Sequence, residues 1–110
     1  MTTFVRNYDD LSTPHQDITV IDFYASWCAP CRAFAPVYER VAGELGDSVT
    51  FTKADVDQNP DLAKRFHVSS IPTLIILNKG QVVSHASGAL SYTALKTYLQ
   101  SIFNKLGPST

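Results

Sequence analysis

The chain has 110 residues and a mass of 12.1 kDa, which suits a single domain with one hydrophobic core. Apolar residues make up 45% and charged residues 17%, a composition that fits a folded globular protein and excludes a disordered one. The formal net charge is −1 and no basic cluster appears, so the sequence argues against a nucleic-acid partner.

The sequence also limits where the protein is expected to work. No apolar run approaches the roughly 18 residues of a membrane span. Residues 1–7 lack the basic and apolar regions of a signal peptide. We therefore expect a cytoplasmic protein without membrane contact. In a reducing compartment, a lone cysteine pair is more often catalytic or metal-binding than a structural disulfide.

The first half of the chain predicts a short strand and a short helix, followed by two core strands with a long helix between them. Residues 4–14 are the least informative and suggest a short strand and a short helix ending at Pro14. The run 18–25 is β-branched, aromatic and nearly all apolar, which predicts a strand buried on both faces, with Asp22 as the exception. A helix is expected from about Ala29 to Gly46, with an interior proline. A second strand follows at 49–56.

The second half predicts a short helix, a hairpin and a last helix. Asn59-Pro60-Asp61 has the N-cap, proline and acidic residue that open a helix, here through about residue 66. Residues 73–77 form a third core strand, and Asn78-Lys79-Gly80 is a hairpin turn into a more polar edge strand at 81–87. An apolar stripe predicts a helix ended by Gly107-Pro108. The order predicts an α/β fold whose sheet has parallel strands and one terminal hairpin, with helices on both faces.

The only two cysteines lie in Trp27-Cys28-Ala29-Pro30-Cys31, between a predicted strand and a predicted helix. The first N–H groups of a helix lack partners and its dipole is positive there, so this place favours a thiolate, the nucleophilic form of cysteine. Residues three apart share a helix face, so Cys28 and Cys31 can approach disulfide geometry. The pair can cycle between dithiol and disulfide.

Several motifs together make the chain resemble the thioredoxin family over almost its whole length. These are the cysteine motif, Asp22 six residues before the first cysteine, Ile71-Pro72-Thr73, and the stretches 53–60, 78–80 and 88–90. The resemblance implies one thioredoxin domain over residues 1–110. It also implies a mixed sheet of five strands flanked by four helices, and an activity that reduces protein disulfides.

The resemblance further implies a role for each residue of the cysteine site. Cys28 is the attacking nucleophile, Cys31 the resolving cysteine, Asp22 the proton acceptor and Lys53 the partner of Asp22. The residues support the role of Asp22 independently, because a carboxyl group in a buried strand has its pKa raised by desolvation.

The resemblance also implies a docking surface and partners. Pro72 matches a cis-proline, next to which the main chain of Ile71 would pair with an extended substrate. The remaining contact residues would be Trp27, Ala29, Pro30, Gly88 and Ala89. The implied partners are an NADPH-linked, flavin-dependent thioredoxin reductase and disulfide-containing proteins. The chain would be a monomer with no bound cofactor or metal, the cysteine pair being its redox centre.

Three residues depart from the family pattern. Ala29 stands where glycine is usual, Tyr24 where a second tryptophan is common, and Ser87 where an apolar residue is usual. Alanine restricts the loop between the cysteines, so Ala29 is expected to move the redox potential, in a direction that the sequence leaves open.

Other interpretations of the cysteine pair are a structural disulfide, inert core thiols and half of a zinc site. Zinc normally needs four ligands, and His15, His67 and His85 show no paired spacing. Two other functions are a disulfide isomerase or oxidant, which needs an oxidising compartment, and a binding module that uses its surface without its thiols. Neither Ala29 nor Pro30 can hydrogen-bond a thiolate through its side chain, which favours a reductase.

Overall fold

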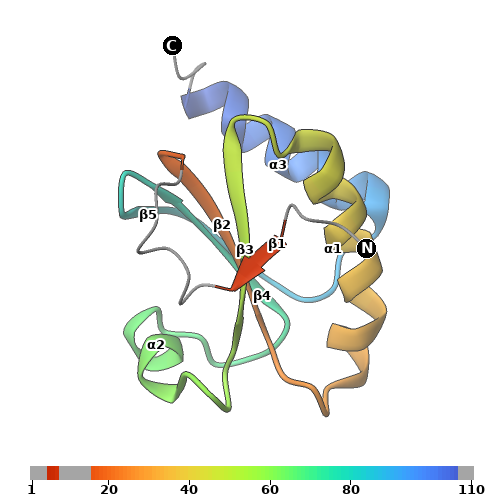
Figure 1. Ribbon diagram of the computed structural model, residues 1–110, viewed down its shortest axis with the longest axis vertical. Helices are drawn as coiled ribbons and strands as arrows, with labels where there is room; N and C mark the ends of the chain where they lie inside the picture. Colours follow the sequence, from red (N-terminus) through yellow and green to blue (C-terminus); the bar gives the residue numbers. More distant parts are fainter. Residues whose placement is uncertain (1–4, 8–15, 107–110) are drawn as a thin grey trace.

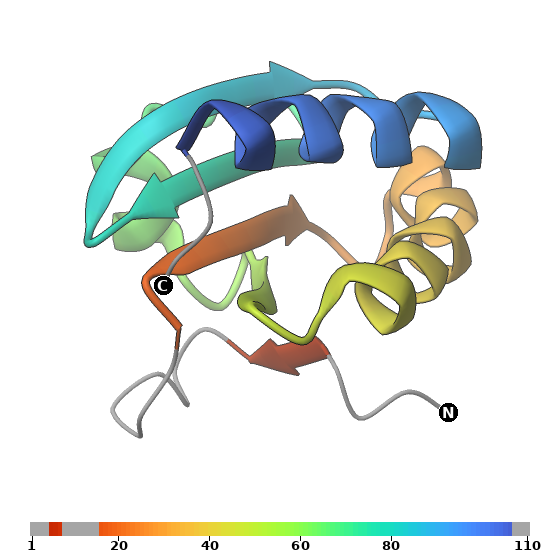
Figure 2. The same ribbon diagram turned by 90° about the horizontal axis from the view of Figure 1, so that it is seen from above.

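The computed structural model describes residues 5–7 and 16–106, and it contains one five-stranded sheet. The strands are β1 (Val5–Asn7), β2 (Ile18–Tyr24), β3 (Val49–Asp55), β4 (Thr73–Asn78) and β5 (Gln81–Ser87). Their spatial order is β1-β3-β2-β4-β5, which Figure 2 shows from β1 at the bottom to β5 at the top. The first three strands are parallel, β4 is antiparallel to β2, and β5 is antiparallel to β4. The predicted mixed sheet with a terminal hairpin is confirmed.

Three helices lie in the described ranges: α1 (Ala29–Leu45), α2 (Pro60–Arg65) and α3 (Tyr92–Leu106). Figure 1 shows α1 and α3 on one side of the sheet and α2 on the other. The implied count of four helices is therefore not met within these ranges. The short helix expected before Pro14 lies outside the described residues.

Strand β2 separates two apolar clusters because its side chains alternate between the faces of the sheet. Ile18 and Val20 pack toward α1 and α3, whereas Ile21 and Phe23 pack toward α2. The α1/α3 cluster also contains Phe34, Tyr38, Val41, Phe51, Leu74, Ile76, Leu95 and Leu99. Asp22 is the next residue after Val20 on the face of β2 that is covered by α1. It lies where the α1/α3 cluster ends, close to the start of α1.

The hairpin turn and the edge strand lie where the sequence predicts them. Lys79 and Gly80 both have positive φ, at 53° and 83°, which is the backbone of a two-residue type I′ turn. Strand β5 lies at the sheet edge and is largely exposed. One register irregularity interrupts its pairing with β4 between Ile76 and Leu77.

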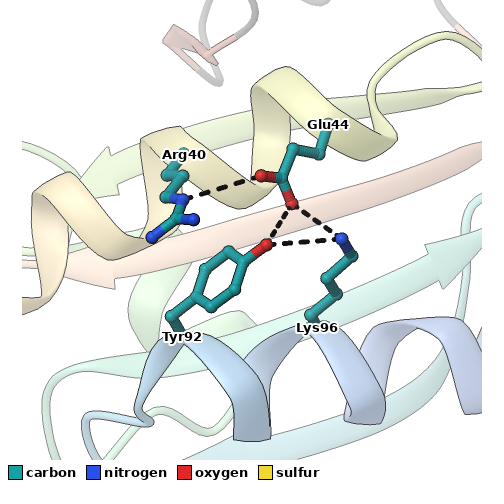
Figure 3. A network of polar contacts seen from close by, with 4 residues as sticks. All are labelled: Arg40, Glu44, Tyr92 and Lys96. Atoms are coloured by element: carbon teal, nitrogen blue, oxygen red, sulfur yellow. Dashed lines mark hydrogen bonds and ion pairs between the residues drawn. The ribbon is translucent and has the colours of Figure 1, made fainter.

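A polar cluster joins the C-terminal half of α1 to the start of α3 (Figure 3). The Tyr92 hydroxyl donates to Glu44 Oε1 at 2.6 Å, and Lys96 Nζ lies 2.9 Å from the same oxygen. The Arg40 guanidinium lies 3.8 Å from the centre of the Tyr92 ring and its Nε is 3.6 Å from Glu44 Oε2. These contacts tie the helix that begins at the cysteine motif to its neighbour.

Candidate functional site

The two cysteines form a disulfide at the corner between β2 and α1. The backbone N–H of Cys28 donates to Ala25 O at 3.2 Å, which closes the turn after β2. Cys28 is the N-cap residue of α1, and its Sγ accepts a hydrogen bond from the backbone N–H of Cys31 at 3.2 Å. The Cα atoms of the pair are 5.2 Å apart, within the range that a disulfide needs. The spacing argument from the sequence is confirmed.

The disulfide is largely covered by neighbouring side chains. Cys28 is 5% exposed and Cys31 3% exposed, and they cluster with buried Ala25. Ile71, which precedes β4, packs against this cluster. The Ile71–Pro72 peptide bond is cis, as the resemblance implied, and the Pro72 carbonyl accepts from Gly88 N–H at 2.8 Å. The segments around residues 71–72 and 88 are thereby joined beside the cysteine pair.

Trp27 stands at the surface next to Cys28 and is held by an acidic residue. Its side chain is 67% exposed, and its Nε1–H donates to Asp57 Oδ2 at 2.7 Å. Ala29, Pro30, Gly88 and Ala89 are also exposed. Asp57 was not identified from the sequence. The available signal was topological, because Asp57 follows β3 and Trp27 follows the parallel neighbour β2 at the same sheet edge.

Asp22 is buried in β2 on the side that faces α1. It is 5% exposed, and its Oδ1 has no hydrogen-bond partner among the described residues. Burial raises the pKa of Asp22 to about 7, and the positive charge of Lys53 opposes this rise. The desolvation expected from the sequence is thus stronger than the effect of the lysine.

Lys53 is the register partner of Asp22 on β3, but its ammonium is directed elsewhere. Lys53 Nζ lies 5.9 Å from the centre of the Tyr24 ring. Among residues 16–106, no ion pair within 4.0 Å joins Asp22 and Lys53. The lysine therefore acts on Asp22 through its charge and not through a direct contact.

A cavity connects the buried carboxyl group with the second cysteine. It opens to solvent, and the centre of a water-sized sphere can occupy about 60 Å³ of it. Its lining residues are Asp22, Tyr24, Cys31, Ala35, Tyr38, Glu39 and Lys53. Two redox-relevant groups predicted from the sequence, Asp22 and Cys31, therefore share one cavity.

Comparisons with known proteins agree with this arrangement. A family model described as Thioredoxin matches residues 2–101. The chain belongs to the thioredoxin family. It is 44% identical over 87 residues to a thioredoxin of Mycobacterium tuberculosis, covering 79% of this chain and 75% of the relative. The solved structure of a mutant thioredoxin of Halobacterium salinarum matches with a TM-score of 0.75 and 32% identity, over 89% of this chain and 88% of that one.

A third relative is a longer protein. The chain is 42% identical over 87 residues to a bifunctional thioredoxin reductase/thioredoxin of Mycobacterium leprae, covering 79% of this chain and 19% of that protein. Membership of the thioredoxin family and the Cys28–Cys31 disulfide together identify a thiol–disulfide oxidoreductase. The interpretations as inert core thiols or half of a zinc site do not account for this bonded pair.

The described ranges contain no candidate metal site. Residues 5–7 and 16–106 contain no group of three His, Cys, Asp or Glu side chains that could hold a metal ion. His67 and His85 are exposed, and His15 lies outside these ranges. No described helix is long and apolar enough to cross a membrane.

Ala35, Tyr38 and Glu39 are the cavity residues that the sequence analysis did not assign to the site. Tyr38 is buried in the core, and its hydroxyl donates toward Thr52 O at 2.7 Å and Val20 O at 3.1 Å. The signal for all three was helical spacing, since positions four, seven and eight residues after Cys31 share its helix face.

Proposed function

We propose that the protein reduces disulfides in other proteins, with Cys28 as nucleophile and Cys31 as resolving cysteine. The Cys28 thiolate attacks a substrate disulfide, forming a mixed disulfide and releasing one substrate thiolate. The Cys31 thiolate then attacks Cys28 Sγ, which forms the intramolecular disulfide and releases the second substrate thiolate. Two electrons pass to the substrate. The observation that carries the proposal is the disulfide-bonded pair at the N-terminus of α1.

Asp22 is proposed to accept the proton of Cys31 before the second attack. This role is supported by the shared cavity and by the pKa of about 7, at which a carboxyl group exchanges its proton near neutral pH. Lys53 is proposed as the partner that limits the rise of this pKa. Its place beside Asp22 in the sheet register supports an electrostatic effect of this sign.

Substrate polypeptide is proposed to dock on Trp27, Ile71, Pro72, Gly88 and Ala89. Ile71 packs against the cysteine cluster, and the buried Pro72 that follows it is hydrogen-bonded to Gly88. Trp27, Gly88 and Ala89 are exposed, which supports docking of an extended segment beside Cys28. Ala29 and Pro30 are proposed to tune the redox potential, because they are the two residues between the cysteines.

The electrons are proposed to come from an NADPH-linked thioredoxin reductase. The printed name of the M. leprae relative supports this partner, because it combines a thioredoxin reductase and a thioredoxin in one protein. We further propose that residues 1–110 act as one thioredoxin domain and as a monomer without a bound cofactor. The cytoplasmic location stays a prediction.

A trapping experiment with two variants tests the order of attack. In Cys31→Ser the mixed disulfide on Cys28 cannot be resolved, so disulfide-containing substrates should stay covalently attached until a reductant is added. In Cys28→Ser, the matched control, no such adduct should form. Equal adducts on both variants would overturn the assignment of Cys28 as nucleophile. The absence of any adduct on Cys31→Ser would favour a binding module.

A further inference from the structure

Glu39 shares the cavity of Asp22 and Cys31 and has no role in the chemistry described so far. It lies on α1 about two turns after Cys31, it is half-buried, and it is the second carboxyl group of the cavity lining. It stands on the same helix face as Cys31 because it follows that residue by eight positions.

The described protein groups offer Asp22 no hydrogen-bonded path for its proton. Asp22 Oδ1 is buried without a partner among residues 5–7 and 16–106. The Tyr38 hydroxyl is engaged by the carbonyl oxygens of Thr52 and Val20, and the Lys53 ammonium lies toward the Tyr24 ring. A proton that leaves Asp22 must therefore cross the cavity. The centre of a water-sized sphere can occupy about 60 Å³ of this cavity, and one water needs roughly 10–15 Å³ by this measure, so the cavity has room for a water bridge.

We propose that Glu39 exchanges the proton of Asp22 with solvent through water in this cavity. The proposal rests on the proposed role of Asp22 and adds the next acceptor. When Cys31 is activated, its thiol proton passes to the Asp22 carboxylate and the thiolate attacks Cys28. The Asp22 carboxyl group then passes its proton through water to the Glu39 carboxylate, which releases it to bulk solvent. No electron moves in the relay, and reduction of the disulfide reverses it.

The charged and titratable groups around this path come from three elements. Asp22 and Tyr24 face it from β2, Lys53 faces it from β3, and Cys31, Tyr38 and Glu39 face it from α1. Glu39 is the only carboxyl group of this lining other than Asp22. A carboxylate oxygen can accept a proton from a bridging water, which the Lys53 ammonium cannot do.

The test measures the resolving step in single turnover. Reduced protein is mixed with a peptide disulfide at concentrations where the rate no longer rises, and the fluorescence of Trp27, the only tryptophan, follows disulfide formation. Glu39→Gln should slow this step roughly tenfold, less than the roughly hundredfold or more that a directly positioned acid or base supplies. Glu39→Asp should restore most of the rate. Asp61→Asn, which removes an exposed negative charge on α2, should leave it unchanged.

Two further readouts separate a proton relay from a merely structural role. Imidazole buffer should raise the resolving rate of Glu39→Gln toward that of wild type, because a mobile base can replace the missing acceptor. The buffer should leave the resolving rate of wild type unchanged. The pH profile of the resolving rate should keep its inflection near pH 7 in Glu39→Gln, because Asp22 still sets that inflection. The plateau rate should fall.

A double variant decides whether Glu39 acts through Asp22. In the Asp22→Asn background, Glu39→Gln should have no additional effect, because no proton then passes between the two positions. A wild-type rate for Glu39→Gln, or an effect that persists in the double variant, would overturn the relay. If Asp22→Asn itself resolves at the wild-type rate, the role of Asp22 fails as well, so the two failures are distinguishable.

Discussion

Asp22 and Lys53 are register partners on β2 and β3, but the Lys53 ammonium lies over the Tyr24 ring, 5.9 Å from its centre. The carboxyl group is therefore buried without a directly bonded cation in the described part of the chain. This separation lets desolvation dominate and accounts for a pKa of about 7.

Asp22→Asn is expected to stabilise the protein increasingly as the pH rises. The pKa of Asp22 is raised from 3.8 to about 7 by folding, so the folded state binds this proton more tightly than the unfolded state does. Stability is lost as the pH rises from about 4 to 7, and the ionised carboxyl group costs up to about 4 kcal/mol above that range, at about 1.4 kcal/mol per pH unit. Asparagine does not ionise, so the variant avoids this cost.

Urea unfolding of wild type and Asp22→Asn at pH 5 and pH 8.5 measures this effect. The stability difference between the two proteins should grow by about 3 kcal/mol between these pH values. The exposed control Asp61→Asn should show little change. A difference between Asp22→Asn and wild type that is independent of pH would contradict the raised pKa.

Tyr38→Phe is expected to destabilise the fold without creating a cavity in the core. The substitution removes a buried hydroxyl that bonds the carbonyl oxygens of Thr52 and Val20 and leaves the ring in place. Only Val20 O has another donor among the described side chains, the Thr52 hydroxyl at 3.1 Å. The free energy of unfolding in urea should fall by about 1–3 kcal/mol with an unchanged m-value. A loss below about 0.3 kcal/mol would mean that the hydroxyl makes no net contribution.

Asp57→Ala is expected to weaken substrate docking and spare the thiol chemistry. Without its acceptor on Asp57, the exposed Trp27 side chain loses the contact that fixes its indole ring. The KM for an insulin-type disulfide substrate should rise roughly threefold to tenfold, as for the loss of about one hydrogen bond, with kcat nearly unchanged. Asp57→Asn keeps an oxygen acceptor and should lie closer to wild type. A fall in kcat at constant KM would contradict a docking role.

Most of the fold was predictable because its signals are local. Strand-like and helical apolar patterns predicted the strand and helix ranges to within a few residues. The glycine of Asn78-Lys79-Gly80 was the signal that predicted the hairpin turn. Asn59 marks the start of α2 as predicted. However, its side chain accepts no hydrogen bond from the N–H groups of the helix, and its amide NH₂ donates to Asp55 O in the preceding segment.

The parts of the site that were missed depend on contacts between distant residues. Asp57 accepts a hydrogen bond from Trp27, 30 positions away, and Glu39 lines the cavity of Asp22 only because α1 packs over β2. The Lys53 ammonium likewise lies over the ring of Tyr24, a residue of the neighbouring strand. Helical spacing places Glu39 on the face of α1 that carries Cys31, but no spacing rule within one element brings it near Asp22 or brings Asp57 to Trp27.

The most direct test of a reductase is the redox potential of the Cys28–Cys31 pair in equilibrium with glutathione buffers. A reductase should equilibrate near the potential of about −270 mV that is characteristic of thioredoxins, with any effect of Ala29 appearing as an offset from it. A potential near about −180 mV, that of protein disulfide isomerase, would contradict the proposed function.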